Sequence, residues 1–243
     1  MNLIFDIGNT RTKATVFVGG EIVGRYTGEG DPAGLARDVL GMYPSADAAI
    51  VSSTRREDDE VYDALRDRIG RVVVFGADTP VPIDNMYRTP GSLGRDRLAA
   101  AVGANFLWLG RNLLVVDFGT AITFDVVTAT GQYLGGNISP GAGMRLRALH
   151  EKTGNLPLLH LPDSAFGATS DTTEDAVRNG VAAGITFEIE GYATRLGAEY
   201  EDLCIIFTGG DADYFAKQVK NPIFAQYDLV AIGLNRILEY NAD

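Results

Sequence analysis

Short apolar runs alternate along this chain with longer segments whose apolar residues recur at helical spacing. Three apolar runs without internal alternation are typical of buried strands: residues 3–5, 113–116 and 204–207. Three longer segments have the apolar spacing of amphipathic helices: residues 32–43, 58–69 and 175–196. The apolar face of the last could be buried in its own domain or at an interface with a second copy. Further strands are expected at 14–18, 21–27, 48–52 and 71–75. This order of elements predicts an α/β fold with mixed sheets flanked by helices.

Polar residues follow the first apolar run closely. Asp6 ends the expected strand, and Gly8, Asn9, Thr10 and Lys13 come next, before the returning strand of a hairpin. Backbone N–H groups at a glycine-containing turn can hold an anion, and a carboxylate at the strand end can hold Mg²⁺ or its water. The pattern fits a loop that binds a nucleoside triphosphate. It equally fits an ordinary hairpin turn with a solvated aspartate, so this stretch alone does not decide.

A second copy of the pattern favours the phosphate loop. Asp117, Gly119 and Thr120 follow the apolar run 113–116, and another returning strand is expected at 122–127. Because the unit occurs once in each half, it indicates internal duplication, with a break near residues 110–112. Two related halves facing each other would form a cleft with a phosphate-holding loop on each wall. A third signal, Gly209 and Gly210 after the run 204–207, offers backbone against which adenosine could lie; by itself it is an ordinary turn.

The segment from Tyr87 to Arg97 contains the other candidate chemistry. Pro90-Gly91 predicts a turn, and a helix is expected from about residue 95, so that Asp96 lies in its first turn. There a carboxylate could accept a proton from a hydroxyl, while Arg97 could hold an anionic group. The alternative is that Asp96 only stabilises the helix start and Arg97 is solvated.

Composition narrows the classes of function. The 243 residues carry a formal net charge of −11, which argues against a nucleic-acid partner. The single cysteine, Cys204, excludes an intrachain disulfide and lies in an apolar run, where a buried thiol is expected. The start lacks a basic segment followed by an apolar one, and no run is long enough to span a bilayer. A cytoplasmic protein without membrane contact is expected. His150 and His160 are not at metal-ligand spacing.

Taken together, the motifs resemble the actin-like ATPases with duplicated halves, and within them the type III pantothenate kinase family. The resemblance rests on six motifs, which begin at Asp6 and end at Leu234 and so cover nearly the whole chain: Asp6-x-Gly8-Asn9-Thr10-x-x-Lys13, Tyr87-x-x-Pro90-Gly91-x-Leu93-Gly94-x-Asp96-Arg97, Asp117-x-Gly119-Thr120, Gly135-Gly136-x-Ile138-x-Pro140-Gly141, Thr208-Gly209-Gly210-Asp211-Ala212 and Asp228-Leu229-Val230-x-x-Gly233-Leu234. It implies two actin-like (ribonuclease H-like) domains, 1–110 and 111–243, with an ATP cleft between them.

The resemblance also implies the site residues. ATP with Mg²⁺ would be bound by Asp6, Ile7, Gly8, Asn9, Thr10, Arg11, Thr12, Lys13, Gly119, Thr120, Gly209 and Gly210. Asp6 would lie near the metal-bound triphosphate, and Asp117 would help to bind a monovalent cation, K⁺ or NH₄⁺.

Pantothenate would be bound by Tyr87, Gly94, Arg95, Asp96 and Arg97, with Asp96 as general base. The reaction would be ATP-dependent phosphorylation of pantothenate to 4'-phosphopantothenate, the first step of coenzyme A biosynthesis. The family is a homodimer whose second subunit completes the substrate pocket with a threonine.

Thr172 matches that position in this sequence, before a helix expected from about residue 174. A threonine there also suits a helix N-cap, and both roles are compatible.

Other classes stay open at this point. A different actin-like kinase or phosphatase would keep the two phosphate loops without the segment from Pro90 to Arg97. A non-catalytic regulator would keep the fold and lose the base, which the presence of Asp6, Lys13, Asp96 and Asp117 argues against.

Overall fold

The chain packs into two compact units. The computed structural model describes residues 1–8, 11–53, 59–163, 165–221 and 223–242. Unit 1 comprises Met1–Leu109, Gly131–Tyr133 and Asp228–Asp243, and unit 2 comprises Gly110–Thr130 and Leu134–Tyr227. The predicted domains 1–110 and 111–243 divide the sequence into duplicated halves and stay a prediction. By packing, the last segment of the chain groups with the first unit.

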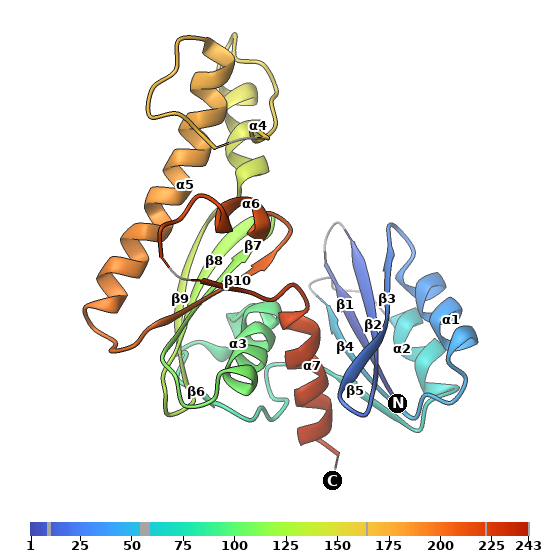
Figure 1. Cartoon of the computed structure of the whole chain (residues 1–243). Coiled ribbons are helices and arrows are strands. Elements are labelled where there is room, and N and C mark those ends of the chain that lie inside the picture. Colours follow the sequence, from blue (N-terminus) through green and yellow to red (C-terminus); the bar gives the residue numbers. More distant parts are fainter. Residues whose placement is uncertain (9–10, 54–58, 164, 222, 243) are drawn as a thin grey trace. The chain divides into compact units, whose positions relative to one another are not determined.

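Unit 1 is built on a five-stranded sheet with the order β3-β2-β1-β4-β5 (Figure 1). Its strands are β1 (Asn2–Ile7), β2 (Thr12–Val18), β3 (Glu21–Gly28), β4 (Ala48–Ser53) and β5 (Arg71–Val74). β1 runs antiparallel to β2 and parallel to β4, and β4 runs parallel to β5. The short strand β6 (Asp84–Asn85) pairs with Gln132 and Tyr133.

The helices of unit 1 cover both faces of this sheet. They are α1 (Pro32–Met42), α2 (Asp59–Arg66), α3 (Arg95–Leu107) and α7 (Leu229–Tyr240), with a 3₁₀ turn at Pro90–Ser92. α1 packs on β2 and β3, whereas α7 packs on β1 and β4. The helices expected at 32–43 and from residue 95 are therefore confirmed. The one expected at 58–69 is shorter, and its predicted first residue lies outside the described part of the chain.

Unit 2 repeats the strand plan of unit 1. Its strands are β7 (Leu113–Phe118), β8 (Ala121–Val127), β9 (Gln132–Pro140), β10 (Cys204–Gly209) and β11 (Ile223–Ala225), in the order β11-β10-β7-β8-β9. The first two residues of β9, Gln132 and Tyr133, belong to unit 1. β7 runs antiparallel to β8 and parallel to β10, and β10 runs parallel to β11. Because these pairings match those of β1, β2, β4 and β5, the duplication expected from the Asp-x-Gly hairpins is confirmed.

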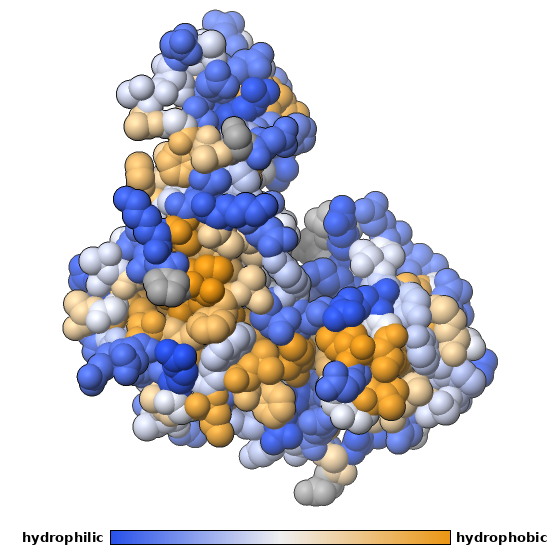
Figure 2. Space-filling view, viewed as in Figure 1, coloured by the Kyte–Doolittle hydropathy of each residue, from blue (hydrophilic) through white to orange (hydrophobic). Residues whose placement is uncertain are grey.

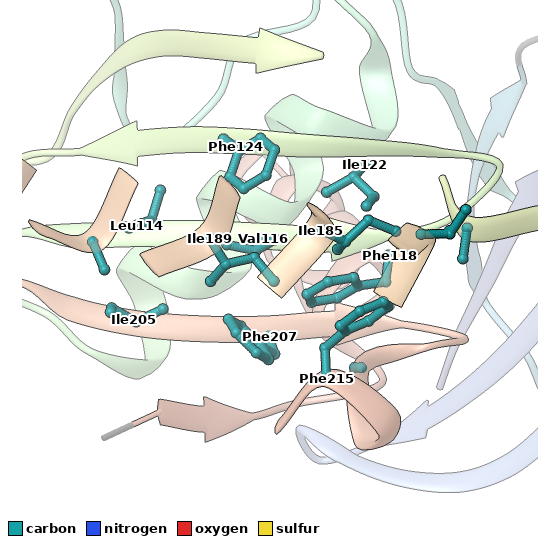
Figure 3. Close-up of a cluster of buried hydrophobic side chains, with 14 of the residues drawn as sticks. Leu114, Val116, Phe118, Ile122, Phe124, Ile185, Ile189, Ile205, Phe207 and Phe215 are labelled. Atoms are coloured by element: carbon teal, nitrogen blue, oxygen red, sulfur yellow. The ribbon is translucent and has the colours of Figure 1, made fainter. Parts of the chain in front are cut away.

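The core of unit 2 joins its sheet to the helices α5 (Thr173–Gly197) and α6 (Ala212–Ala216) (Figure 3). Phe118 from β7 stacks on Phe215 from α6, with 5.1 Å between ring centroids. Ile185 and Ile189 of α5 are buried against the same cluster, whereas Phe187 is 63% exposed. Helix α4 (Ala142–Lys152) packs on α5. The helix predicted at 175–196 is thus confirmed as α5, and its apolar face is buried within unit 2 except at Phe187.

Two glycines allow α3 and α7 of unit 1 to cross in direct backbone contact. A Cβ at Gly233 would lie 1.8 Å from the carbonyl oxygen of Ala99, and one at Gly103 would lie 2.4 Å from that of Leu229. A larger residue at either position would force the helices apart. α3 carries Asp96 and is therefore held in place by the C-terminal helix.

The thiol of Cys204 is buried in β10, as its apolar setting predicted. Both units expose apolar side chains among hydrophilic ones on the face shown in Figure 2. Among the helices in the described ranges, none has the length and apolar character needed to cross a membrane.

Candidate active site

The first Asp-x-Gly hairpin brings Asp6 and Lys13 opposite each other. They are register partners at the ends of β1 and β2. The N–H of Gly8 donates to the carbonyl oxygen of Arg11 at 3.0 Å and closes the loop. The predicted ATP-binding residues Asn9 and Thr10 lie outside the described residues.

Burial changes the acidity of Asp6. The partly buried carboxyl group has its pKa raised from 3.8 to about 6, mainly by desolvation. The positive charge of Lys13 opposes this rise, and the negative charge of Asp96 adds to it. A carboxyl group with a raised pKa beside a cation is the arrangement expected where a charged ligand or metal completes the electrostatics.

The other predicted residues of this hairpin have different exposures. The side chains of Ile7 and Thr12 are buried, so contact with a ligand would come from their main chain. Arg11 is exposed and forms an ion pair with Glu29 at 3.3 Å. Such an exposed pair adds little stability and leaves the arginine able to exchange partners.

Helix α3 presents Asp96 at its first turn. Gly94 is the N-cap, and Asp96 Oδ1 accepts a hydrogen bond of 2.9 Å from the N–H of Arg97. A Cβ at Gly94 would lie 2.6 Å from Asp96 Oδ1, so the glycine leaves room for the carboxylate. Asp96 therefore does stabilise the helix start. It is also close enough to Asp6 for their charges to interact.

Arg97 and Tyr87 form a layered contact beside Asp96. The guanidinium carbon of Arg97 lies 5.8 Å from the centroid of the Tyr87 ring, and Tyr87 stacks on the buried Tyr133 at 6.3 Å. Arg97 is only 5% exposed, so the alternative of a solvated arginine was wrong. The position of the buried guanidinium over an aromatic face is fixed by this cation–π contact.

Arg95 links α3 to the end of β4. Its Nη1 donates to the carbonyl oxygen of Ser53 at 3.2 Å, and its buried Nε has no hydrogen-bond partner among the residues that the structure describes. Ser52, next along β4, is the register partner of Asp6. The carboxyl ends of β1 and β4 and the first turn of α3 therefore meet in unit 1. Polar residues could be assigned to each of these three places from the sequence, but nothing in the sequence predicted that the three would lie together.

The second hairpin in unit 2 is a shorter version of the first. The N–H of Gly119 donates to the carbonyl oxygen of Ala121 at 3.1 Å, where Gly8 bonds to Arg11 in unit 1. Asp117 faces Thr123 in the register, so this copy lacks a counterpart of Lys13.

Gly141 clamps this loop from the end of β9. Its N–H donates to the carbonyl oxygen of Thr120 at 3.1 Å, and a Cβ there would lie 2.4 Å from the carbonyl oxygen of Gly119. The exposed Thr120 is thus held on a fixed main chain. Sequence reasoning had assigned no role to Gly141, although it lies in one of the motifs of the resemblance.

Gly209 is pressed against Asp117 at the end of β10. It has a φ of +92°, and a Cβ there would lie 2.4 Å from Asp117 Oδ1 and 2.6 Å from the carbonyl oxygen of Phe118. Gly210 donates its N–H to that carbonyl oxygen at 2.9 Å. The Gly-Gly turn therefore packs directly against the Asp117 carboxylate and the Phe118 carbonyl, which leaves no room for a side chain at Gly209.

Thr172 lies at the start of α5, where it is the N-cap. Its hydroxyl accepts the N–H of Asp175 at 3.2 Å, which confirms the helix-cap role. His150 Nδ1 bonds to the carbonyl oxygen of Leu156, a hydrogen-bonding role as expected. Within the described ranges, no three His, Cys, Asp or Glu side chains gather as a metal-binding cluster.

Comparison with solved structures identifies the fold. A Baf family protein from Campylobacter jejuni superposes with a TM-score of 0.66 at 21% identity, over 98% of each chain. The ROK hexokinase from Thermus thermophilus superposes with a TM-score of 0.51 at 13% identity, over 99% of each chain. The expected actin-like architecture is confirmed.

Sequence comparison is more specific. A family model described as type III pantothenate kinase matches residues 2–195. The type III pantothenate kinase of Phocaeicola vulgatus is 41% identical over 244 residues, which cover 99% of each chain. That of Porphyromonas gingivalis is 41% identical over 242 residues, covering 99% of this chain and 98% of the relative. With the duplicated hairpins and the Asp96 segment all in place, the chain belongs to the type III pantothenate kinase family.

Proposed function

We propose that this protein transfers the γ-phosphoryl group of ATP to the terminal hydroxyl of pantothenate, with Asp96 as general base. The product would be 4'-phosphopantothenate, in the first step of coenzyme A biosynthesis. The observation that carries the proposal is the convergence of Asp6, on the first phosphate hairpin, and Asp96, on the first turn of α3.

ATP would be held by both Asp-x-Gly hairpins. Lys13 and the backbone around Gly8 would contact phosphates from unit 1, and Gly119 and Thr120 from unit 2. The backbone at Gly209 and Gly210 would lie against adenosine. Mg²⁺ commonly takes one or two protein carboxylates and completes its shell with phosphate and water. A single carboxyl group such as Asp6 therefore fits it without a dedicated cluster of acids.

Pantothenate would bind beside α3. Its carboxylate suits the buried guanidinium of Arg97, and Tyr87 supplies an apolar wall. Gly94 and Arg95 would complete this side of the pocket.

Asp96 would then orient the acceptor hydroxyl and take its proton while the oxygen attacks phosphorus. Positioning and electrostatic stabilisation would supply most of the acceleration, because a loose phosphoryl-transfer transition state needs little covalent help.

A monovalent cation, K⁺ or NH₄⁺, would bind beside Asp117. The support for this is the Asp117 carboxylate, an oxygen ligand for cations, and its contact with the Gly-Gly turn that would lie against adenosine. The cation would reduce repulsion between Asp117 and the phosphates. We further propose that the working form is a cytoplasmic homodimer, in which Thr172 of one subunit completes the pantothenate pocket of the other.

The test is ADP release by the purified protein with MgATP, with and without pantothenate, in potassium and then in sodium buffer. Turnover that requires pantothenate and is faster in potassium supports both the substrate and the cation. Hydrolysis of ATP that ignores pantothenate would overturn the substrate assignment and point to another actin-like enzyme.

A further inference from the structure

Ser52 is a buried polar residue near the carboxyl end of β4. Its side chain is only 1% exposed, and its hydroxyl forms no hydrogen bond to a residue in the described ranges. Buried hydroxyl groups in folded proteins nearly always have a hydrogen-bond partner. The hydroxyl of Ser52 can therefore serve a neighbouring group that turns toward it.

The neighbouring group is the carboxylate of Asp6. Asp6 is the register partner of Ser52 on one side and of Lys13 on the other, so the three residues form one row across the sheet. Neighbouring strands lie about 4.8 Å apart, and paired residues point their side chains to the same face. At this spacing, rotation about the side-chain bonds is enough to bring a serine hydroxyl to a carboxylate oxygen.

This row lies on the face of the sheet that α7 covers. On the other face, Leu3 and Phe5 of β1 pack in an apolar cluster with residues of α1. Because side chains alternate along a strand, Asn2 and Asp6 point away from that cluster. Asn2 Nδ2 donates to Asn235 Oδ1 of α7 at 2.8 Å, which confirms the direction. Helix α3 packs on α7 and on β4 in the same unit.

The first turn of α3 is fixed at the same end of β4. Arg95 Nη1 donates to the carbonyl oxygen of Ser53, the residue after Ser52, at 3.2 Å. Strand β4 thus contacts both elements that carry a proposed active-site carboxylate, β1 with Asp6 and α3 with Asp96. The in-register position favours Asp6 as the acceptor for the hydroxyl.

We propose that Ser52 is a positioning residue, whose hydroxyl donates to one carboxylate oxygen of Asp6 and leaves the other oxygen directed at the divalent metal of the bound nucleotide. This inference rests on the proposed function for the place of the nucleotide, and it adds the residue that orients the carboxylate. Carboxylates that bind metals are commonly hydrogen-bonded to a further protein group, which fixes their orientation.

The first experiment measures nucleotide binding without turnover. Calorimetry gives the Kd of a non-hydrolysable ATP analogue, with Mg²⁺ and then with EDTA, for wild type and Ser52→Ala. We expect the Kd with Mg²⁺ to rise about 10- to 100-fold in the variant, the range for loss of a group that orients a metal ligand. The Kd in EDTA should stay nearly unchanged. Equal changes in both Kd values, or no change in either, would overturn the inference.

Two further variants separate the hydrogen bond from other effects of the substitution. Ser52→Cys fills the same place with a weak donor, so it should behave as Ser52→Ala does. Thr15→Val is the matched control, because Thr15 is a 6% exposed hydroxyl residue on the same face of the sheet, two positions after Lys13. It should keep both wild-type Kd values. Circular dichroism checks that each variant is folded.

Either variant can contradict the inference. A wild-type Kd with Mg²⁺ in Ser52→Cys would show that the space filled by the side chain matters and the hydrogen bond does not. A change in Thr15→Val as large as that in Ser52→Ala would show that loss of any buried hydroxyl in this sheet has the same effect.

Initial rates distinguish Asp6 from Asp96 as the acceptor. If Ser52 positions Asp6, Ser52→Ala should need more Mg²⁺ for its half-maximal rate and have a lower kcat, with a nearly unchanged KM for pantothenate. A raised KM for pantothenate with the Mg²⁺ dependence of wild type would assign the hydroxyl to Asp96 and so reject its assignment to Asp6.

The outcomes separate this inference from the proposed function. If wild type phosphorylates pantothenate and Ser52→Ala binds the analogue with Mg²⁺ as tightly as wild type does, the role of Ser52 is wrong and the function stands. If Ser52→Ala loses only the Mg²⁺-dependent binding, while wild type shows no pantothenate-dependent turnover, the role of Ser52 stands and the proposed acceptor is wrong.

Discussion

The carboxyl groups of Asp6 and Asp96 lie close enough in unit 1 for the negative charge of Asp96 to raise the pKa of Asp6. One ends a strand of the first phosphate hairpin, and the other lies in the first turn of α3. Two interacting carboxylates in one site can have separate roles in phosphoryl transfer. In the proposed function, Asp6 would lie near the metal-bound triphosphate and Asp96 would accept the proton of the acceptor hydroxyl.

Replacement of the proposed base tests this division. Asp96→Asn keeps the size of the side chain and an oxygen for the N–H of Arg97, but it removes a proton acceptor. We expect kcat for pantothenate-dependent ADP release to fall about 10²- to 10⁴-fold. The Kd for ATP, measured by calorimetry, should change little. Turnover within a factor of two of wild type would contradict the assignment.

The raised pKa of Asp6 predicts a pH dependence of stability. Because its folded-state pKa of about 6 exceeds 3.8, the folded protein binds more protons than the unfolded chain between these values. The favourable contribution of protonated Asp6 is therefore complete below pH 3.8 and is lost as the pH rises through 6.

Asp6→Asn should remove this dependence. We expect the free energy of unfolding of the variant, relative to wild type, to be higher at about pH 7.5 than at about pH 4. Urea unfolding of both proteins at the two values measures it. If the free energy of unfolding of Asp6→Asn differed from that of wild type by the same amount at both pH values, the raised pKa of Asp6 would be contradicted.

Gly209 should tolerate no side chain. Gly209→Ala places a Cβ 2.4 Å from Asp117 Oδ1 and forces a positive φ on alanine. We expect about 1–3 kcal/mol of destabilisation in urea, together with weaker ATP binding. Gly41→Ala is the control, because Gly41 lies in α1 with no atom within 4 Å of a Cβ, so it should be neutral or slightly stabilising. Equal stability of the two variants would contradict the close contact.

The proposed cation site predicts a coupled effect of Asp117 and potassium. Wild type should be faster in potassium than in sodium buffer at equal ionic strength. Asp117→Asn should lose most of its activity and all of the remaining difference between the two buffers, because a neutral amide binds cations weakly. Initial rates over a potassium titration measure both effects. A variant that keeps the potassium response would place the cation elsewhere.

Local patterns in the sequence were sufficient to predict most helices and strands and the internal duplication. The two Asp-x-Gly hairpins are short motifs whose turns close on themselves, so Gly8 and Gly119 could be assigned from neighbouring residues. The helical spacing around Ile185 and Ile189 predicted the helix α5, because a core helix keeps its periodicity, but it did not show where the apolar face would be buried.

The contacts between elements could not be predicted in this way. Nothing near Asp6 in the sequence indicates that Asp96 will approach it, since that approach depends on the packing of α3 against β4. The clamp of Gly141 on the loop at Thr120 is likewise a tertiary contact between β9 and the second hairpin. The exposure of Phe187 could not be predicted either, because the sequence does not show whether an apolar residue of this helix faces the core or the solvent.

The direct crossing of Gly103 and Gly233 has a consequence for synthesis on the ribosome. α7 is made after the whole of unit 2, yet it covers α3 and two central strands of unit 1. Domains generally fold as their residues emerge, but unit 1 must wait for this final helix. Unit 2, whose described strands and helices all precede α7, can fold first. The nascent chain should therefore carry an exposed apolar face on α3 until α7 has been made and packs on it.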